Sequence, residues 1–285
     1  MIPEPNSVAP LRLMSVLAHP DDETFGGAGL MARATASGHM AAAVCATRGE
    51  AGEIANPTLA TPETLGKVRE QELRTALSIV GVTDVSFLDY LDGHLAEADL
   101  HEVIGRIVAQ LRRFHPDIIV TFAPNGMYGH PDHMAISRFA IAAVSAAADP
   151  AQYPEQIAAG LQPHRVHKVY MQTTGRERLL EFRALEQAQG RDFIPGGNAA
   201  TIPVEEMGSP LSEITTIVRL TDDELALKMR AMRAHATQIS DDNPFINGTP
   251  DEMRERMGAE SFILAPPPIS EKAYPTPETD LFSNL

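Results

Sequence analysis

Two copies of the tripeptide His-Pro-Asp place imidazole and carboxylate groups at short spacing in this sequence. The first lies in His19-Pro20-Asp21-Asp22-Glu23, and the second in Tyr128-Gly129-His130-Pro131-Asp132-His133. Residues three apart share one face of an incipient helix, so His19 and Asp22 can bind one ion together, and His133 can complete the set from another loop. Two imidazoles and one carboxylate suit Zn²⁺, and three protein ligands leave a position open for water, as in catalytic zinc sites.

The remaining groups of the two motifs suit amide hydrolysis. A bound ion would lower the pKa of water and polarise a carbonyl group. Asp21 and Asp22 are adjacent, so we expect one of them to bind the ion and the other to serve as the base. His130 would then lie near the developing oxyanion or the leaving group, as an electrophile or a general acid. Asp132 is expected to orient an imidazole, and Glu23 is placed in the same outer layer of groups behind the ligands.

A purely structural interpretation also fits one copy of the motif. A histidine can cap a helix, proline suits the first helical turn, and an aspartate there complements the helix dipole. Two copies at strand ends that can face each other favour the metal site over this interpretation.

Three glycines follow the first motif closely, at Gly26, Gly27 and Gly29. They do not have the spacing of a dinucleotide-binding turn, because the turn itself carries the residues of the first motif. Two carboxylates at that turn would also repel a pyrophosphate. We expect these glycines to let a helix approach the sheet or the metal loop closely.

Apolar strands alternate with amphipathic helices through the first half of the chain. This alternation predicts an α/β fold with a mostly parallel sheet that is covered on both faces. Ligands of such sheets bind beyond the carboxyl ends of the strands, which is where both motifs occur. The predicted strands span 11–18, 40–47, 84–89 and 117–122, and the predicted helices span 24–37, 62–80, 97–114 and 131–148.

The second half of the chain is less regular. We expect strands over 166–172 and 215–220, a helix over 222–238, an irregular Pro-rich segment near 264–278 and an extended tail over 1–10. Neither an internal repeat nor a linker is evident, so we interpret 1–285 as one domain. In this interpretation 1–150 form the core with the metal site, and 151–285 are elaborations that complete the substrate pocket.

Composition limits the classes of partner. The 285 residues carry a formal net charge of −15, which argues against nucleic acid and anionic membranes. A membrane span and a secretory signal are not expected, because a long apolar run and a basic leader are both missing from the sequence. Cys45 is the only cysteine, which excludes an internal disulfide framework and favours a cytoplasmic location. A homo-oligomer is compatible with the sequence.

The two motifs, AHPDDE at 18–23 and GHPDH at 129–133, resemble the paired signatures of the LmbE/PIG-L family of zinc-dependent N-acetylglucosaminyl deacetylases. The likeness extends through TRGEAGE at 47–53, the helix that contains Arg69 and Glu72, and AHATQ at 234–238. It therefore covers most of the chain. AHATQ and ETDLF at 278–282 also look like the mycothiol-pathway branch of the family. The resemblance implies a Rossmann-like three-layer α/β fold with an elaborated C-terminal part.

The resemblance also implies roles for individual residues. It implies a base role for Asp21 and, for His130, stabilisation of the tetrahedral intermediate or protonation of the departing amine. Tyr128 matches a tyrosine that helps to hold the substrate carbonyl oxygen. The resemblance implies a substrate-binding position at Arg69. Glu53, in the loop after the second predicted strand, and His235, one turn from Gln238, are further candidates for substrate contacts. The implied zinc ligands are His19, Asp22 and His133.

These expectations combine into a zinc hydrolase that removes the N-acetyl group from an N-acetylglucosamine-containing small molecule. One alternative is an amidase that cleaves a larger thiol conjugate of the mycothiol type. Another is a metal-dependent sugar-binding protein without turnover. The sequence leaves open the aglycone of the sugar and the metal, since Fe²⁺ and Co²⁺ accept the same ligands as Zn²⁺.

Overall fold

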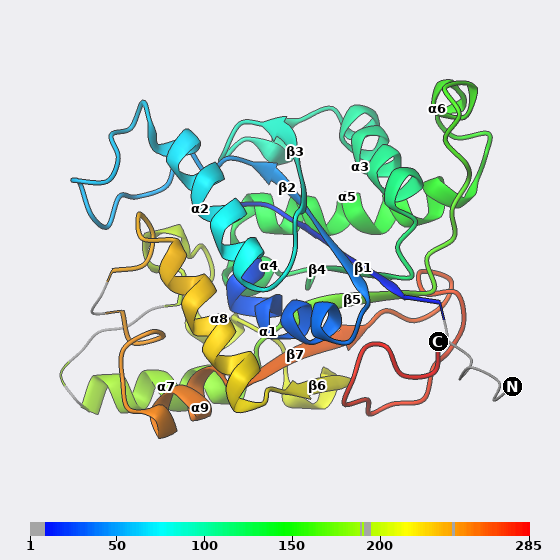
Figure 1. Cartoon of the computed structure of the whole chain (residues 1–285). Helices are drawn as coiled ribbons and strands as arrows, with labels where there is room; N and C mark the ends of the chain where they lie inside the picture. The colour runs from blue at the N-terminus through cyan, green and yellow to red at the C-terminus, as the bar shows by residue number, and fades with distance from the viewer. Residues whose placement is uncertain (1–8, 189, 191–194, 241–242) are drawn as a thin grey trace, which may run out of the picture.

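The computed structural model describes residues 9–188, 190, 195–240 and 243–285 (Figure 1). Most of the tail predicted over 1–10 lies outside these ranges. Within them, the strands form one seven-stranded sheet in the order β3-β2-β1-β4-β5-β7-β6. The strands are β1 Arg12–Leu17, β2 Met40–Thr47, β3 Asp84–Tyr90, β4 Ile118–Phe122, β5 Lys168–Thr173, β6 Thr216–Arg219 and β7 Ala259–Leu264.

The helices alternate with the strands in the first half of the chain and follow a less regular order afterwards. The sequence predicted α1, α2, α3, α5 and α8 to within a few residues at each end, but it did not predict α7 or α9. The helices are α1 Asp22–Ala36, α2 Leu65–Ile79, α3 Leu100–Phe114, α4 Gly126–Gly129, α5 Pro131–Ala148, α6 Pro154–Ala158, α7 Arg176–Ala188, α8 Asp222–Ala234 and α9 Pro250–Met257.

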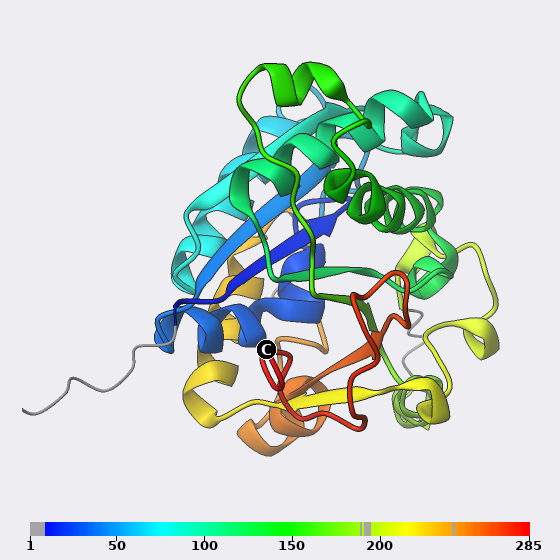
Figure 2. The same cartoon turned by 90° about the vertical axis from the view of Figure 1, so that its right-hand side faces the viewer.

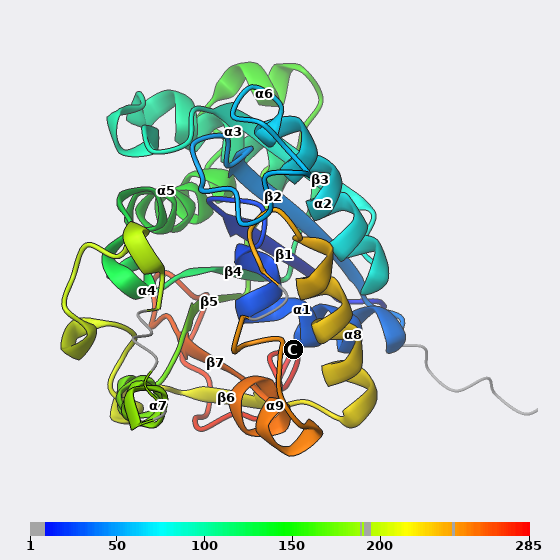
Figure 3. The same ribbon diagram turned by 90° about the vertical axis from the view of Figure 1, so that its left-hand side faces the viewer.

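The sheet separates two hydrophobic cores, as its two layers of helices require. Figure 3 shows α1, α2 and α8 on one side of the sheet and α3 and α5 on the other. The first core contains Leu30, Leu73 and Met232, and the second contains Ile107 and Phe139, all of them buried. This arrangement confirms the predicted α/β class with a mostly parallel sheet.

The order of the strands creates a switch point at the carboxyl end of β1. The chain runs outward from β1 to β2 and β3 on one side, and β4 and β5 continue the parallel sheet on the other. The connections after β1 and β4 therefore leave the sheet in opposite directions and open a crevice between them. The first motif follows β1, and the second leads from the β4 connection into the first turn of α5, so both reach this crevice.

The strands predicted over 166–172 and 215–220 are confirmed as β5 and β6, but β7 and its antiparallel pairing were not predicted. Strand β7 pairs antiparallel with both β5 and β6 and lies between them, as Figure 2 shows from the side. Residues 259–264 lie in the part of the sequence that gave no clear pattern. The position of a strand that inserts between two earlier strands depends on pairing with distant parts of the chain, and short-range hydrophobic periodicity does not predict such pairing.

Among the described residues, no helix combines the length and the apolar character that a bilayer crossing requires.

Candidate active site

The connection from β1 to α1 has a strained backbone. Asp21 is the N-cap of α1 and has φ 116° and ψ −28°, a conformation that is costly for a residue with a side chain. Two neighbours hold it there: Glu23 Oε2 accepts the Asp21 N–H (3.0 Å), and Arg69 donates to the Pro20 carbonyl (2.6 Å). The His-Pro-Asp of this copy is therefore no ordinary helix cap.

The second copy does include a helix cap. His130 is the N-cap of α5, and its Nδ1 accepts the N–H of Asp132 (3.2 Å), with Pro131 in the first turn. The preceding turn has another strained residue, Met127, with φ 71° and ψ −64°. The capping role that a structural interpretation assigns to the histidine thus holds for His130. It leaves Nε2 of that ring available to other groups.

Three side chains from the two motifs converge in the crevice. His19 Nδ1 lies 3.1 Å from His133 Nε2 and 3.7 Å from Asp22 Oδ2, and His133 Nε2 lies 3.2 Å from Asp22 Oδ1. A tetrahedral ion with bonds of roughly 2.0–2.2 Å holds its ligand atoms about 3.3–3.6 Å apart. The spacing and the chemical types of these three groups therefore fit a divalent metal ion.

Backbone groups hold two of these three side chains in place. Asp22 Oδ2 accepts the N–H groups of Ala18 (3.2 Å) and His19 (2.7 Å), and His133 Nδ1 lies 3.2 Å from the Gly126 carbonyl. These contacts leave Asp22 Oδ1 and His133 Nε2 directed at the shared position. A fixed partner on the other ring nitrogen is what a metal-binding histidine requires.

Two carboxylates lie behind His19. Its Nε2 is 2.9 Å from Asp92 Oδ1 and 3.3 Å from Asp132 Oδ2, and all three residues are buried. Asp132 also accepts the N–H groups of Gly93 and Leu95, which fixes its carboxylate. The sequence pointed to Asp132 but missed Asp92. The available signal was the position of Asp92 just beyond a strand end, although the strand predicted over 84–89 stops three residues before it.

The cluster carries an excess of negative charge. Burial alone would lower the pKa of His19, but hydrogen bonds with Asp132 and Asp92 and the charge of Asp22 raise it to about 10. Burial would raise the pKa of Asp22, but the charges of His133 and His19 hold it well below its usual range. A site that favours a cation this strongly also favours a metal ion, which would take the place of the proton on a ligating imidazole.

Asp21 lies beside the three converging groups and contacts Arg69, whose Nη2 is 3.2 Å from Asp21 Oδ2. Burial raises the pKa of Asp21 to about 6, even though Arg69 acts in the opposite direction. Arg69 itself is buried, and it also donates to the Gly49 carbonyl (2.7 Å). In this structure Arg69 orients Asp21 and the surrounding backbone.

Two aromatic groups border the cluster. The ring of His130 lies 4.8 Å from that of His19 and 4.9 Å from that of His133, measured between centroids. Burial and the two neighbouring histidines lower the pKa of His130 to about 4. The half-buried Tyr128 packs its ring edge-on against His133, with 5.0 Å between centroids.

Glu53 and His235, the other two residues expected to contact the substrate, lie in different environments. Glu53 is exposed and accepts a hydrogen bond from Asn198 (2.6 Å), which puts it on an outer loop. His235 is fully buried, and its Nε2 lies 2.8 Å from Glu23 Oε1. A side chain with no exposed surface does not reach a substrate in this structure, so His235 supports Glu23 instead.

Comparison with known proteins finds relatives over most of the chain. Residues 14–144 match the family model described as PIG-L: GlcNAc-PI de-N-acetylase. A "1D-myo-inositol 2-acetamido-2-deoxy-alpha-D-glucopyranoside deacetylase" of Streptomyces avermitilis is 36% identical, with 96% of this chain and 97% of that protein covered. A "Mycothiol S-conjugate amidase" of Streptomyces coelicolor is 31% identical, with 96% and 97% covered.

A solved structure shares the fold. The N,N'-diacetylchitobiose deacetylase of Pyrococcus horikoshii superposes with a TM-score of 0.64 at 21% identity, with 89% of this chain and 83% of that one covered. At this identity the likeness shows the fold alone.

Proposed function

Because this chain belongs to the PIG-L/LmbE family, as its sequence resemblance indicated, we propose that it is a metal-dependent N-deacetylase of a GlcNAc-containing small molecule. The observation that carries the proposal is the convergence of His19, Asp22 and His133 beside the carboxylate of Asp21, which Arg69 holds. A protein that only binds a sugar has no need of a carboxylate poised beside the ligands. The non-catalytic alternative is therefore not favoured.

We assign the metal to His19 Nδ1, Asp22 and His133 Nε2. Their distances and the negative field around them support this set. Zn²⁺ is the proposed ion, because two imidazoles and one carboxylate are a common zinc set. When bound, the ion would supply Lewis acidity, which polarises the amide carbonyl and makes water more acidic.

The protein's own groups provide the proton transfers. Asp21 takes a proton from the attacking water while the water oxygen adds to the carbonyl carbon of the amide. Arg69 keeps the carboxylate of Asp21 in place through their 3.2 Å contact. When the C–N bond breaks, the same proton passes to the departing nitrogen, so that acetate and a free amine leave.

His130 and Tyr128 would stabilise the oxyanion that forms on the carbonyl oxygen. Because His130 Nδ1 accepts a backbone N–H, the neutral ring carries its proton on Nε2. We therefore propose that His130 acts as a hydrogen-bond donor and not as a general acid. The hydroxyl of Tyr128 would be the second donor to this oxygen.

The substrate we propose is N-acetylglucosamine linked to inositol, in line with the name of the Streptomyces avermitilis relative. Glu53 remains our candidate for a sugar contact by its place on an exposed loop, whereas the buried Arg69 is assigned to positioning Asp21. The proposed location is the cytoplasm. One domain over 1–285 is also our proposal, since the strands of both halves pair in a single sheet.

A substrate comparison tests this assignment against the amidase alternative. Specificity constants would be measured with the zinc-loaded protein for the inositol-linked N-acetylglucosamine and for an S-conjugate of mycothiol. We expect the small N-acetyl sugar to be preferred at least about tenfold, which is a difference of 1.4 kcal/mol in the barrier. The opposite order would assign the chain to conjugate cleavage.

A further inference from the structure

A buried ion pair makes hydrogen bonds to the backbone of α1. Here the N–H groups of Gly29 and Leu30 donate to Glu260 (2.9 and 2.8 Å), and the Phe25 carbonyl accepts from Lys228 (2.8 Å). Glu260 and Lys228 are themselves 2.8 Å apart. The pair thus links α8 and β7 directly to the backbone of α1.

The pair is enclosed by the protein. The side chains of Lys228 and Glu260 are 1% and 0% exposed. Burying two charges costs solvation energy that their attraction does not reliably return, so apolar residues would stabilise the fold about as well. Unlike apolar residues, the ion pair makes directional hydrogen bonds to particular peptide groups of α1, and these bonds fix the position of those groups.

The helix fixed in this way carries the reacting groups at its start. Asp21 and Asp22 lie one turn before the Phe25 carbonyl that Lys228 holds. His235, the C-cap of α8, binds Glu23 of α1, and the other carboxylate oxygen of Glu23 accepts the N–H of Asp21. The first two turns of α1 are therefore held at two points, by Lys228 at the Phe25 carbonyl and by His235 through Glu23.

The glycines of α1 allow its surroundings to come close. A Cβ atom on Gly26 would lie 2.4 Å from the Gln172 side chain, and one on Gly29 would lie 2.4 Å from Leu220. The amide of Gln172 also reaches the Asp22 carbonyl (3.4 Å). These contacts agree with the close approach expected from the glycine cluster, and they leave α1 little room to shift.

On the basis of the proposed function, we propose that Lys228 and Glu260 are positioning residues for the deacetylation site. Their ion pair sets where the first turn of α1 lies, and hence where Asp21 and Asp22 meet His19 and His133. Neither residue touches the metal or the substrate. Their effect passes through the backbone of Phe25, Gly29 and Leu30.

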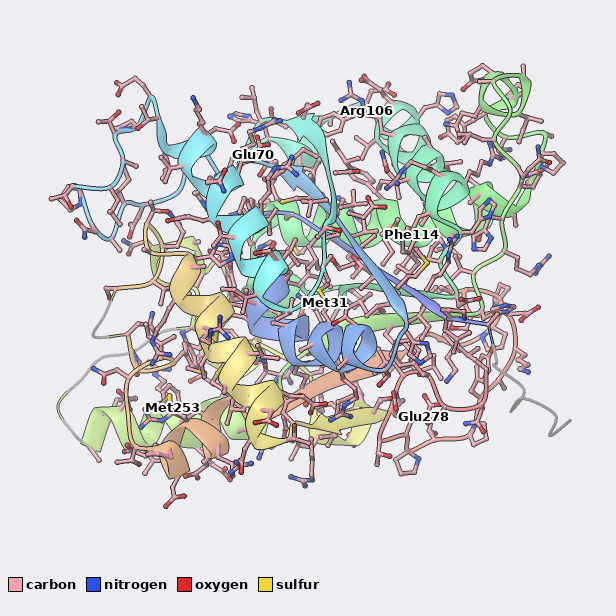
Figure 4. All side chains as sticks on the ribbon, viewed as in Figure 1. Met31, Glu70, Arg106, Phe114, Met253 and Glu278 are labelled. Atoms are coloured by element: carbon pink, nitrogen blue, oxygen red, sulfur yellow. The ribbon has the colours of Figure 1, made fainter. Side chains whose placement is uncertain are left out.

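The chain contains a matched control pair. Lys168 and Glu278 form another buried ion pair, 2.7 Å apart and 0% and 2% exposed. Lys168 also binds the carbonyls of Leu281 and Ser283, so this pair anchors the C-terminal segment instead of α1. Glu278, labelled in Figure 4, bridges to β6 at Thr216.

The test compares the double variants Lys228→Met/Glu260→Gln and Lys168→Met/Glu278→Gln. Each removes both charges of one pair and leaves no unpaired buried charge, so each is expected to fold. The measurements are Tm, Zn²⁺ affinity by chelator competition, and kcat and KM separately. We expect the first variant to lose about 10–100-fold in Zn²⁺ affinity and in kcat, with KM nearly unchanged. The control should change Tm only.

Wild-type Zn²⁺ affinity and kcat in Lys228→Met/Glu260→Gln would overturn the proposal, as would equal losses in both double variants. If a double variant does not fold, Lys228→Gln/Glu260→Gln and Lys168→Gln/Glu278→Gln serve for the same comparison, because their paired amides can still hydrogen-bond and leave no buried charge. Zn²⁺ affinity is measured without substrate, so failure of the proposed activity and failure of the positioning role are distinguishable.

Discussion

His19 Nδ1 and His133 Nε2 lie 3.1 Å apart although 114 positions separate the two residues in the chain. The separation is closed by the order of the strands, because β1 and β4 are neighbours and their connections diverge at the switch point. The contact brings the two His-Pro-Asp motifs into one site. The predictions below follow from that geometry.

Removal of one imidazole from the proposed ligand set should abolish tight metal binding. In His133→Ala the buried Nε2 that faces His19 and Asp22 is lost, and two ligands do not hold Zn²⁺ at chelator-resistant affinity. Metal content after dialysis, measured by atomic emission, should fall from one ion per chain to near zero. His94→Ala is the control, since His94 is exposed and pairs with the exposed Glu97. A full complement of tightly bound metal in His133→Ala would remove His133 from the set.

Asp21→Asn should separate metal binding from turnover. Asparagine keeps the size of the side chain and can still contact Arg69, but it cannot take a proton from water. We expect kcat to fall by about 10²–10⁴-fold, with Zn²⁺ content unchanged. Retention of most of the activity would show that another group is the base.

Asp92 should prove important even though sequence patterns did not identify it. Its carboxylate lies 2.9 Å from His19 Nε2 and accepts the Ala51 N–H, so it holds the ring from behind. Asp92→Asn is expected to weaken Zn²⁺ affinity about 10–100-fold. The nearby Asp89→Asn is the control, because Asp89 is exposed and pairs with Arg48. Equal metal affinities in the two variants would argue against the role of Asp92.

Kinetics of His235 variants distinguish a residue that contacts the substrate from one that supports Glu23. The sequence placed this residue in the substrate pocket, whereas the structure buries it against Glu23. Loss of a substrate contact raises KM, but loss of support for Glu23, and through it for Asp21, lowers kcat. We expect steady-state kinetics of His235→Ala to show about a tenfold or larger loss of kcat with little change in KM. His235→Gln, which can still donate to Glu23, should recover part of that loss. A rise in KM alone would return His235 to the substrate pocket.

The sequence predicted best those features that a short segment of the chain specifies by itself. Regular alternation through residue 148 predicted the parallel strands β1 to β4, and the two motifs predicted which side chains meet at their ends. The paired motifs also indicated the family. Each of these patterns lies within a short segment of the chain, so it can be recognised without knowledge of the tertiary fold.

The remaining features depend on how distant elements pack. Strand β7 enters the sheet between β5 and β6, and nothing in residues 259–264 alone specifies those partners. The burial of His235 follows from the docking of α8 on α1. The ion pair between Lys228 and Glu260 joins α8 to β7, two elements that the periodicity of the sequence does not relate.

Release of primary amine from the inositol-linked N-acetylglucosamine tests the central claim most directly. The assay would use the zinc-loaded wild type, with zinc-loaded Asp21→Asn at the same concentration as the control. The account predicts stoichiometric amine and acetate from the wild type and at most about one hundredth of that rate from the variant. Absence of amine release by the wild type with one Zn²⁺ bound per chain, or equal rates from both proteins, would contradict it.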